Sequence, residues 1–392
     1  MSEEDKYLAN VYQRFPITLT KGKGAKVWDI NGREYVDCMG GYGVALVGHC
    51  NEKVVKAIKE QVEKLITCHS SYYNDSRLAF LQKLISVAPK GLSKAYLSNS
   101  GAEATEAAIK FARKYTKKHG IVAMMGSFHG KTMGALSITY AKKYRESFTP
   151  LLEGMKFVRF GEATKVEDAI DDTTGAVILE PIQGESGINV APEGYLQEVR
   201  DICDRKGIAL IFDEIQAGLG RTGKLWAGEN WNVTPDIMCL AKGIAGGVPM
   251  GATLAKQEMM DALKLGEHSS TFGGNPLACA AGRAALECIV DDGLLGNVNS
   301  VGKYFKEGLL ALKDKHKIIR EVRGLGLMLA AELRFEVKDV LYDGIKEGLL
   351  MLYSGKNIIR LLPPLVIDEH TVAHTLSIMD KVLSKEEDRR NV

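Results

Sequence analysis

Asp213 is the first candidate for chemistry, because it comes directly after the apolar run 208–212. A carboxylate that emerges from a buried strand is costly without a partner. One suitable partner is the pyridine nitrogen of a cofactor, which the acid would keep protonated so that the ring can accept electrons. A helix cap or a metal ligand is the alternative.

Lys242 holds a similar position, after residues 236–241 and before the glycine-containing run 243–247. Desolvation and a nearby positive ring lower the pKa of a lysine toward the neutral amine, which is the form that makes a Schiff base. A surface lysine is the alternative.

Three further segments could bind parts of the same ligand. Residues 96–103 turn from a short strand through Gly101 and Ala102 into a helix, whose free N–H groups and dipole suit a phosphate dianion. Phe128 could stack on a planar ring, and the hydroxyls of Ser270 and Thr271 in a glycine-rich turn could bind phosphate. Ordinary helix caps and core packing are the alternatives. The occurrence of all these features in one order along the chain is specific for pyridoxal 5′-phosphate (PLP).

The elements around these residues predict an α/β fold. Amphipathic helices at 52–66, 76–88 and 102–118 alternate with short apolar runs at 121–125, 176–179 and 208–212. This alternation is typical of a mostly parallel sheet with helices on both faces. Ligands of such sheets bind beyond the carboxyl ends of the strands, where Asp213 and Lys242 should lie.

The chain should contain more than one domain, because 392 residues exceed the usual limit of about 250 to 300 residues for one core. A hairpin is predicted at 24–37 around Asn31-Gly32. After a helix at 276–290 the pattern changes to a long helix, strands near 321–333 and 358–361, and a final helix. We predict an amino-terminal segment of the small domain at 1–50, a large domain at 51–292, and a carboxy-terminal small α+β domain at 293–392.

Composition excludes several classes of function. The 51 basic and 49 acidic residues nearly balance, so nucleic acid is not an expected partner. The basic run Lys142, Lys143 and Arg145 could receive an acidic protein or could be a solvated helix face. Seven scattered cysteines without a Cys-x-x-Cys spacing indicate no metal site and fit a reducing cytoplasm. No stretch approaches the ~18 apolar residues of a membrane span, so we expect a soluble, unprocessed, cytoplasmic protein.

The sequence resembles the class III, ω-amino-acid group of PLP-dependent aminotransferases of fold type I. The resemblance runs from about residue 24 to residue 367 and is carried by SNSGAEATEAAIKFAR, SFHGKTMGALS, EPIQGESG, IFDEIQAGLGRTGK, LAKGIAGGVPMGA and STFGGNPLACAA. It is similar to the acetylornithine aminotransferases and, in KYRESF, EVRGLGLM and IIRLLPPLVI, to the branch that acts on lysine or ornithine attached to the acidic carrier protein LysW.

The resemblance implies roles in binding PLP. Lys242 would be the Schiff-base lysine, Asp213 the partner of the pyridinium, and the following Glu214 part of the same cofactor site. Ile215 and Phe128 would pack on the two sides of the ring, and Gln216 would approach the ring hydroxyl. The remaining implied contacts are to the phosphate, from backbone groups of Gly101 and Ala102 and from Thr271 of a second subunit. Shared active sites imply a homodimer.

The resemblance also implies how substrates bind. Arg360 would grip the α-carboxylate of glutamate, and Glu185 would cover this arginine when the amino substrate is bound; surface salt bridges are the alternative. Ser270 would lie near the substrate, and Tyr42 would touch its carboxylate. The family usually has Phe-x-Gly-Arg where this chain has Lys131 after Gly130, so a point charge replaces a planar fork and anion binding becomes less directional.

The implied reaction exchanges the terminal amino group of a lysine or ornithine derivative, carrier-linked or acetylated, with 2-oxoglutarate and glutamate in lysine or arginine biosynthesis. A 4-aminobutyrate aminotransferase is the nearest alternative, and a PLP-dependent racemase or mutase, which needs no oxo-acid acceptor, is a more distant one. A non-catalytic subunit of the same fold is disfavoured by the presence of both Lys242 and Asp213.

Overall fold

The computed structural model describes residues 3–391. Positions 1, 2 and 392, at the outer ends of the first and last predicted domains, lie outside the described residues. Within 3–391 there is no helix long and apolar enough to pass through a bilayer. All seven cysteines are free thiols.

A seven-stranded sheet forms the centre of the larger part of the molecule. Its strands are β4 (Lys94–Ser98), β5 (Gly120–Met124), β6 (Met155–Val158), β7 (Thr174–Leu179), β10 (Ala209–Asp213), β11 (Ile237–Leu240) and β12 (Gly251–Ala255). They lie in the order β4-β12-β11-β10-β7-β5-β6. β10 pairs in parallel with β7 and β11, β5 pairs in parallel with β6 and β7, and β12 runs antiparallel to both β11 and β4. The predicted mostly parallel sheet is confirmed.

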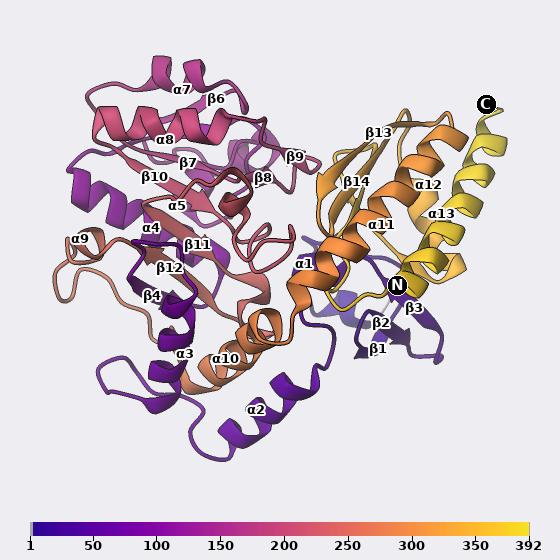
Figure 1. Ribbon diagram of the computed structural model, residues 1–392, viewed down its shortest axis with the longest axis horizontal. Coiled ribbons are helices and arrows are strands. Elements are labelled where there is room, and N and C mark those ends of the chain that lie inside the picture. Colours follow the sequence, from indigo (N-terminus) through magenta and orange to yellow (C-terminus); the bar gives the residue numbers. More distant parts are fainter. Residues whose placement is uncertain (1–2, 392) are drawn as a thin grey trace.

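Helices cover both faces of this sheet (Figure 1). Successive residues of β10 show why: Ala209 and Ile211 pack in the core beneath α4 (Gly101–Thr116), whereas Leu210 and Phe212 pack beneath α8 (Tyr195–Lys206). Side chains alternate along a strand, so a strand buried on both faces is apolar throughout. The predicted helix 102–118 is two residues too long, because Lys117 adopts a left-handed conformation with φ 58°.

The chain ends form two smaller sheets beside the large one. β1 (Leu19–Lys23), β2 (Lys26–Asp29) and β3 (Glu34–Asp37) make a sheet that is completed by β15 (Leu349–Leu350), which pairs in parallel with β3. The second sheet has the order β13-β14-β17-β16 and is covered by long helices. Its elements are β13 (Ile319–Leu325), β14 (Met328–Leu333), β16 (Leu352–Ser354), β17 (Ile358–Leu361), α11 (Leu294–Lys315), α12 (Lys338–Glu347) and α13 (Glu369–Arg390).

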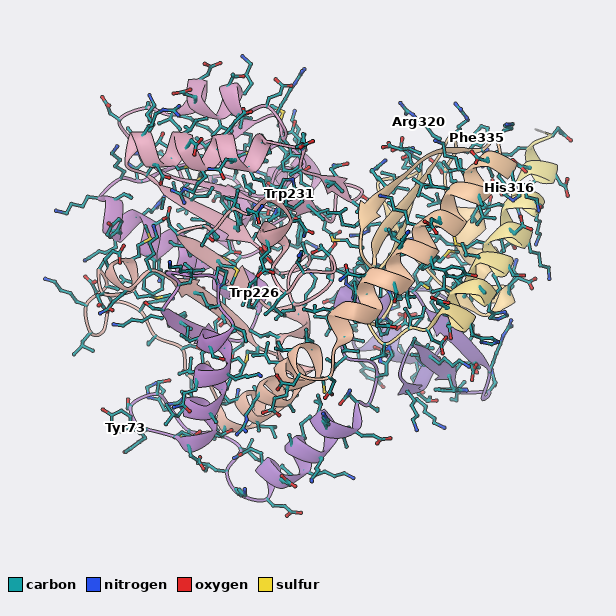
Figure 2. The ribbon with its side chains drawn as sticks, in the orientation of Figure 1. Tyr73, Trp226, Trp231, His316, Arg320 and Phe335 are labelled. Carbon is teal, nitrogen blue, oxygen red and sulfur yellow. The ribbon has the colours of Figure 1, made fainter. Side chains whose placement is uncertain are left out.

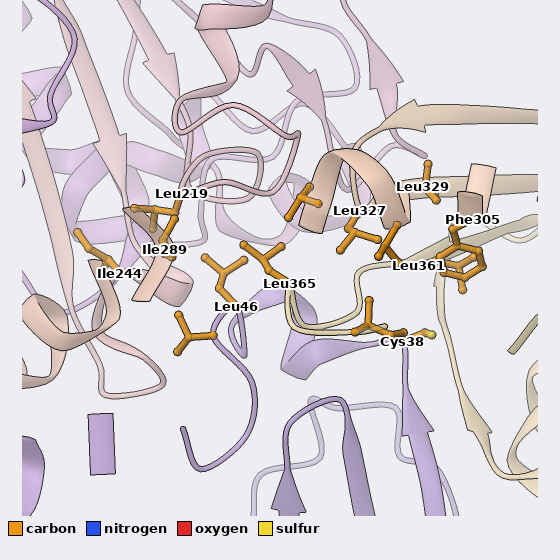
Figure 3. Packing of buried hydrophobic residues seen from close by; sticks show 14 of the residues in the cluster. Cys38, Leu46, Leu219, Ile244, Ile289, Phe305, Leu327, Leu329, Leu361 and Leu365 are labelled. Carbon is orange, nitrogen blue, oxygen red and sulfur yellow. The ribbon is translucent and has the colours of Figure 1, made fainter. Parts of the chain in front are cut away.

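One hydrophobic core continues between the large and small parts. Leu46, Leu219, Ile244 and Ile289 from the side of the large sheet belong to the same buried cluster as Phe305, Leu327, Leu361 and Leu365 (Figure 3). A shared apolar core resists hinge motion more than a polar interface does. The predicted domain boundaries at 50 and 292 stay predictions, because this core crosses both.

Among the remaining elements α10 (Pro276–Val290) is a long, largely buried helix, and most of the others are short. The others are η1 (Glu3–Lys6), α1 (Gly40–Gly43), α2 (Glu52–Val62), α3 (Asp75–Ser86), α5 (Met133–Ser137), α6 (Lys142–Arg145), η2 (Glu146–Phe148), α7 (Ala163–Ala169), β8 (Ile182–Gln183), β9 (Asn189–Val190), η3 (Ala227–Trp231), η4 (Lys242–Ala245) and α9 (Gln257–Met260).

Candidate active site

A cleft of about 330 Å³ lies where β10 and β11 end. It brings together residues that are far apart in the sequence, as expected for the carboxyl edge of a parallel sheet. The predicted residues in its lining are Gly101, Ala102, Phe128, Lys131, Glu185, Asp213, Ile215, Gln216 and Lys242. His129, Gly130, Glu180 and Ala241 complete the lining.

The Asp213 carboxylate is buried and fixed at both oxygens. Its Oδ1 accepts a hydrogen bond from Ile215 N at 3.0 Å, and its Oδ2 lies 2.7 Å from His129 Nδ1. The other ring nitrogen of His129, Nε2, is buried without a hydrogen-bond partner among the described residues. These contacts fix the orientation of the carboxylate in the lining of the cleft.

Lys242 begins the short helix η4 in a left-handed conformation, with φ 49°. A non-glycine residue rarely adopts this conformation, which costs about 1–3 kcal/mol and is often found at functional sites. Burial lowers the pKa of the Lys242 amine, although Glu185, Asp213 and Glu180 act in the opposite direction. Lys242 forms no ion pair with any carboxylate among residues 3–391. Its amine is therefore available to a ligand.

The amino terminus of α4 opens into the same cleft. Ser100 caps the helix through its Oγ, which accepts a hydrogen bond from Glu103 N. The amides of Gly101 and Ala102 come next, at the end of the helix where N–H groups lack intrahelical partners. A Cβ atom at position 101 would lie 2.9 Å from Ile215 Cδ1, so a side chain there would have to displace the Ile215 side chain. The sequence predicts an anion site at this helix end, and the free amides there are compatible with one.

These residues fit a planar, phosphorylated pyridine ring. Phe128 and Ile215 supply apolar walls, and the helix end supplies donors for a dianion. Two buried polar atoms of the cleft residues, His129 Nε2 and Gln216 Oε1, have no protein partner within 3–391. Unpaired buried polar atoms are costly, and they commonly mark a place where a ligand or water completes the site.

Arg360 and Glu185 form a bidentate ion pair at one side of the cleft. Arg360 Nη1 donates to Glu185 Oε1 at 2.9 Å and Nη2 donates to Oε2 at 3.2 Å. Arg360 is 1% exposed, so the pair is not the surface salt bridge that was its alternative. Burial opposes ionisation of Glu185, but the charge of Arg360 holds the pKa of Glu185 below its ordinary value.

Tyr42 and Lys131 are the remaining predicted substrate contacts. Tyr42 is 46% exposed, and its charge environment includes Arg360 and Glu185, which puts it at the entrance of the cleft. Lys131 Nζ lies 4.8 Å from the centre of the Tyr144 ring and 5.9 Å from that of Phe128. These cation–π contacts hold the lysine beside the aromatic wall.

Three predicted residues lie away from the cleft of their own chain. Glu214 is a correction: its carboxylate accepts hydrogen bonds from Ala227 N and Gly228 N, on the side opposite to Asp213. Adjacent side chains in extended backbone point in opposite directions, so Asp213 and Glu214 do not both face the cleft. Ser270 accepts from Asn99 Nδ2 at 3.2 Å, and Thr271 is exposed.

His129 and Glu180 are cleft residues for which the sequence suggested no role. Glu180 accepts hydrogen bonds from Phe128 N and Gly184 N. Burial raises the pKa of Glu180 to about 7, although His129 opposes this shift. The signal for His129 was its place next to Phe128, and the signal for Glu180 was a polar residue directly after the apolar run 176–179.

Comparison with known proteins gives matches over nearly the whole chain. The family model of class-III aminotransferases matches residues 7–383. The acetylornithine aminotransferase of Methanopyrus kandleri is 47% identical over 375 residues, 95% of this chain and 96% of that protein. Ornithine aminotransferase 1 of Staphylococcus aureus is 43% identical and is aligned over 96% of this chain and 97% of its own length.

Solved structures agree with these matches. The ornithine aminotransferase of Toxoplasma gondii superposes with a TM-score of 0.95 at 34% identity, covering 98% of this chain and 94% of that chain. The acetylornithine aminotransferase of Elizabethkingia anophelis has a TM-score of 0.87 at 32% identity and covers 97% of both chains. The predicted fold type I is thereby confirmed.

Proposed function

The chain belongs to the class-III aminotransferases, and we propose that it exchanges the terminal amino group of an ornithine or lysine derivative with 2-oxoglutarate. The enzyme is PLP-dependent, as this family is. PLP, when bound, supplies an electron-withdrawing ring that stabilises a carbanion at the substrate carbon. We assign the phosphate to the amides of Gly101 and Ala102, the ring to Phe128, Ile215 and Gln216, and the ring nitrogen to Asp213, all of which line the cleft.

Lys242 is the proposed catalytic residue. Its Nζ would hold the cofactor covalently and, when the incoming amine has displaced it, would take and return the proton on the reacting substrate carbon. The lowered pKa of this amine supports the role, because only a neutral amine is a nucleophile or a base. Asp213, oriented by its contact with His129, would face the cofactor nitrogen.

The Arg360–Glu185 pair is the observation that carries the proposal. An aminotransferase of this kind must accept two substrates in turn, one with a second carboxylate and one with a terminal amine. Arg360 offers a planar fork for the α-carboxylate of glutamate or 2-oxoglutarate. With Glu185 in place the same guanidinium is neutralised, and the cleft can take an amine whose chain carries no carboxylate at that position. Glu185 paired with Arg360 would favour the amine substrate, and Glu185 turned away from Arg360 would favour the dicarboxylate.

The relatives named for acetylornithine and ornithine support a substrate with the length of ornithine. We propose that Tyr42 and Lys131 bind the carboxylate of this substrate. We also propose that Ser270 lies near the substrate. Such a reaction belongs to arginine or lysine biosynthesis, for which we propose a cytoplasmic location in accord with the seven free thiols.

A group of basic side chains beside the cleft, the cationic ridge, supports a carrier-linked substrate over an acetylated one. It consists of Lys131, Lys142, Lys143 and Arg145, of which Lys131 and Lys143 both lie 4.8 Å from the Tyr144 ring centre. None of the four forms an ion pair with a carboxylate in the described part of the chain. An acidic carrier protein could dock on this ridge and present its amine to the cleft.

We further propose a homodimer with shared sites. Thr271 and Phe272 are exposed, and Tyr73 projects from the body of the molecule (Figure 2). The two loops that carry them are tied together by Arg77, which donates to Tyr72 O and Gly274 O. A second copy seated on this surface would cover its apolar side chains and bring Thr271 to the phosphate of the neighbouring site.

A half-reaction assay tests the proposed function. The absorbance of the holoenzyme is followed after addition of ornithine, acetylornithine, carrier-linked lysine or 4-aminobutyrate, each without an oxo acid. We expect acetylornithine or the carrier-linked amine to change the absorbance of the cofactor fastest. Addition of 2-oxoglutarate should then restore the original absorbance with formation of glutamate. Discharge by 4-aminobutyrate alone would contradict the biosynthetic assignment. Turnover of one amino acid without any acceptor would favour a racemase or mutase.

A further inference from the structure

The loop that carries Glu185 is held by side chains from the carboxy-terminal sheet. Arg360 of β17 donates from Nη1 to Gly184 O at 3.0 Å, and Ser354 of β16 donates to Glu185 O. Arg323 of β13 donates from Nε to Gly187 O at 2.8 Å. Three carbonyls within four consecutive residues are thus bound by three different strands of one sheet.

Apolar packing against the same sheet also fixes this loop. Ile182 and Ile188, at the two ends of the β8–β9 hairpin, share a buried cluster with Met328, Leu352 and Ile358. Gly187, with φ 118°, approaches this sheet so closely that a Cβ atom would lie 2.5 Å from Ile358 Cδ1. The backbone around Glu185 therefore has little freedom, and its carboxylate can leave Arg360 only by rotation of its own side chain.

We propose that Ser354 and Arg323 are positioning residues that set how readily Arg360 exchanges Glu185 for an incoming carboxylate. The inference rests on the proposed function of the Arg360–Glu185 pair and adds what controls it. Ser354 is 3% exposed, and its hydroxyl donates to the backbone of the very residue that must swing.

The physical basis is competition between a tethered and a free ligand for one guanidinium. Glu185 is the tethered ligand, and its effective concentration at Arg360 depends on how narrowly its backbone is held. A rigid anchor keeps this concentration high, so an oxo acid binds only when it is abundant. A looser anchor lowers the concentration and favours the free carboxylate. The two anchoring residues would thereby balance the two half-reactions without touching either substrate.

The binding of glutarate, a dicarboxylate that cannot accept an amino group, measures this competition directly. Calorimetric titration of the holoenzyme gives its Kd for the wild type and for Ser354→Ala and Arg323→Lys, which keep Arg360 and Glu185. We expect both variants to bind glutarate about three- to tenfold more tightly, the range that loss of one hydrogen bond produces. The matched control is Thr375→Val, which removes another buried hydroxyl that donates to a backbone carbonyl, far from the loop; its Kd should be unchanged.

Two outcomes would overturn the proposals, and they can be told apart. If both variants bind glutarate within about twofold of the wild type, the anchoring proposal is wrong while the function stands. If Arg360→Ala binds glutarate as well as the wild type does, the carboxylate site itself is misassigned and the proposed function fails. Thermal melting checks that each variant is folded; if Ser354→Ala is not, Arg323→Lys, which retains the charge next to Glu332, decides the question alone.

Discussion

His129 Nδ1 lies 2.7 Å from Asp213 Oδ2, and both side chains are buried. The imidazole therefore orients the carboxylate that we assign to the cofactor nitrogen. Loss of the residue that orients a metal ligand typically costs about 10- to 100-fold in activity, and we expect a similar effect for this carboxylate. We expect His129→Ala to lower kcat by that amount and to shift the pH dependence of the cofactor absorption band.

A histidine elsewhere provides the control for this substitution. His370 lies exposed at the start of α13, and His370→Ala should leave both kcat and the absorption band unchanged. An unaltered band in His129→Ala, together with wild-type kcat, would mean that Asp213 does not depend on the imidazole.

Replacement of Lys242 tests the covalent role. Lys242→Ala should bind the cofactor without the yellow absorbance of the wild type, and borohydride should no longer fix it to the protein. Transamination should fall by about four orders of magnitude or more, as for other enzymes that lose their nucleophile. Lys242→Arg keeps the positive charge and should be as inactive. Turnover by either purified variant at the wild-type rate would refute the mechanism.

The departure at position 131 predicts a gain for Lys131→Arg. A guanidinium binds a carboxylate through two parallel hydrogen bonds, whereas an ammonium acts as a point charge. We expect the KM for free acetylornithine to fall about three- to tenfold, and the KM for 2-oxoglutarate to stay constant because Arg360 is unaltered. Lys131→Gln should raise the first KM. A rise of KM in Lys131→Arg would indicate that the substrate is recognised elsewhere, for example on the cationic ridge.

Glu214 predicts a pH dependence of stability. Burial raises the pKa of Glu214 from an ordinary value of 4.5 to about 7 in the folded protein. Between these two values the folded chain keeps a proton that the unfolded chain has lost, so the stability contributed by this group falls as pH rises. The loss amounts to about 3 kcal/mol and is complete by about pH 8.

Glu214→Gln does not titrate, so the difference in unfolding free energy between it and the wild type should grow in favour of the variant between about pH 5 and about pH 8. Urea titrations at several pH values measure this. The slope of the difference is the test, because loss of an acceptor for the Ala227 or Gly228 amide shifts the variant by an amount that does not depend on pH. A constant difference would show that Glu214 is ionised throughout this range.

Hybrid dimers test whether two chains share each site. Thr271→Asp should repel the phosphate from the partner's site and inactivate the homodimer, and Lys242→Ala should do so within its own cleft. A hybrid of the two variants would hold one site with both defects and one with neither. Mixing the inactive proteins after reversible denaturation should therefore restore up to about a quarter of wild-type activity if chains pair at random. No recovery would argue against shared sites.

The positions of Asp213 and Lys242 could be predicted from the sequence because both follow apolar runs, and parallel strands bring their carboxyl ends to one edge. The direction of Glu214 was within reach too, since side chains alternate in extended backbone. The partner of Asp213 was not: His129 and Asp213 are 84 residues apart, and no local pattern encodes their contact. The hydrogen bond from Ser354 to the Glu185 carbonyl spans 169 residues. Its acceptor is a backbone carbonyl, which every residue has, so residue types do not indicate it.

The pairing of β15 with β3 has a consequence for how the molecule is made. Val36 pairs with Leu349, so the first hairpin keeps a bare edge until the ribosome has delivered nearly the whole chain. Unpaired edges invite association with other chains, and contacts between such distant residues form slowly. We expect nascent chains arrested before residue 349 to be captured by chaperones or to aggregate, and a purified chain truncated at the same point to aggregate for the same reason.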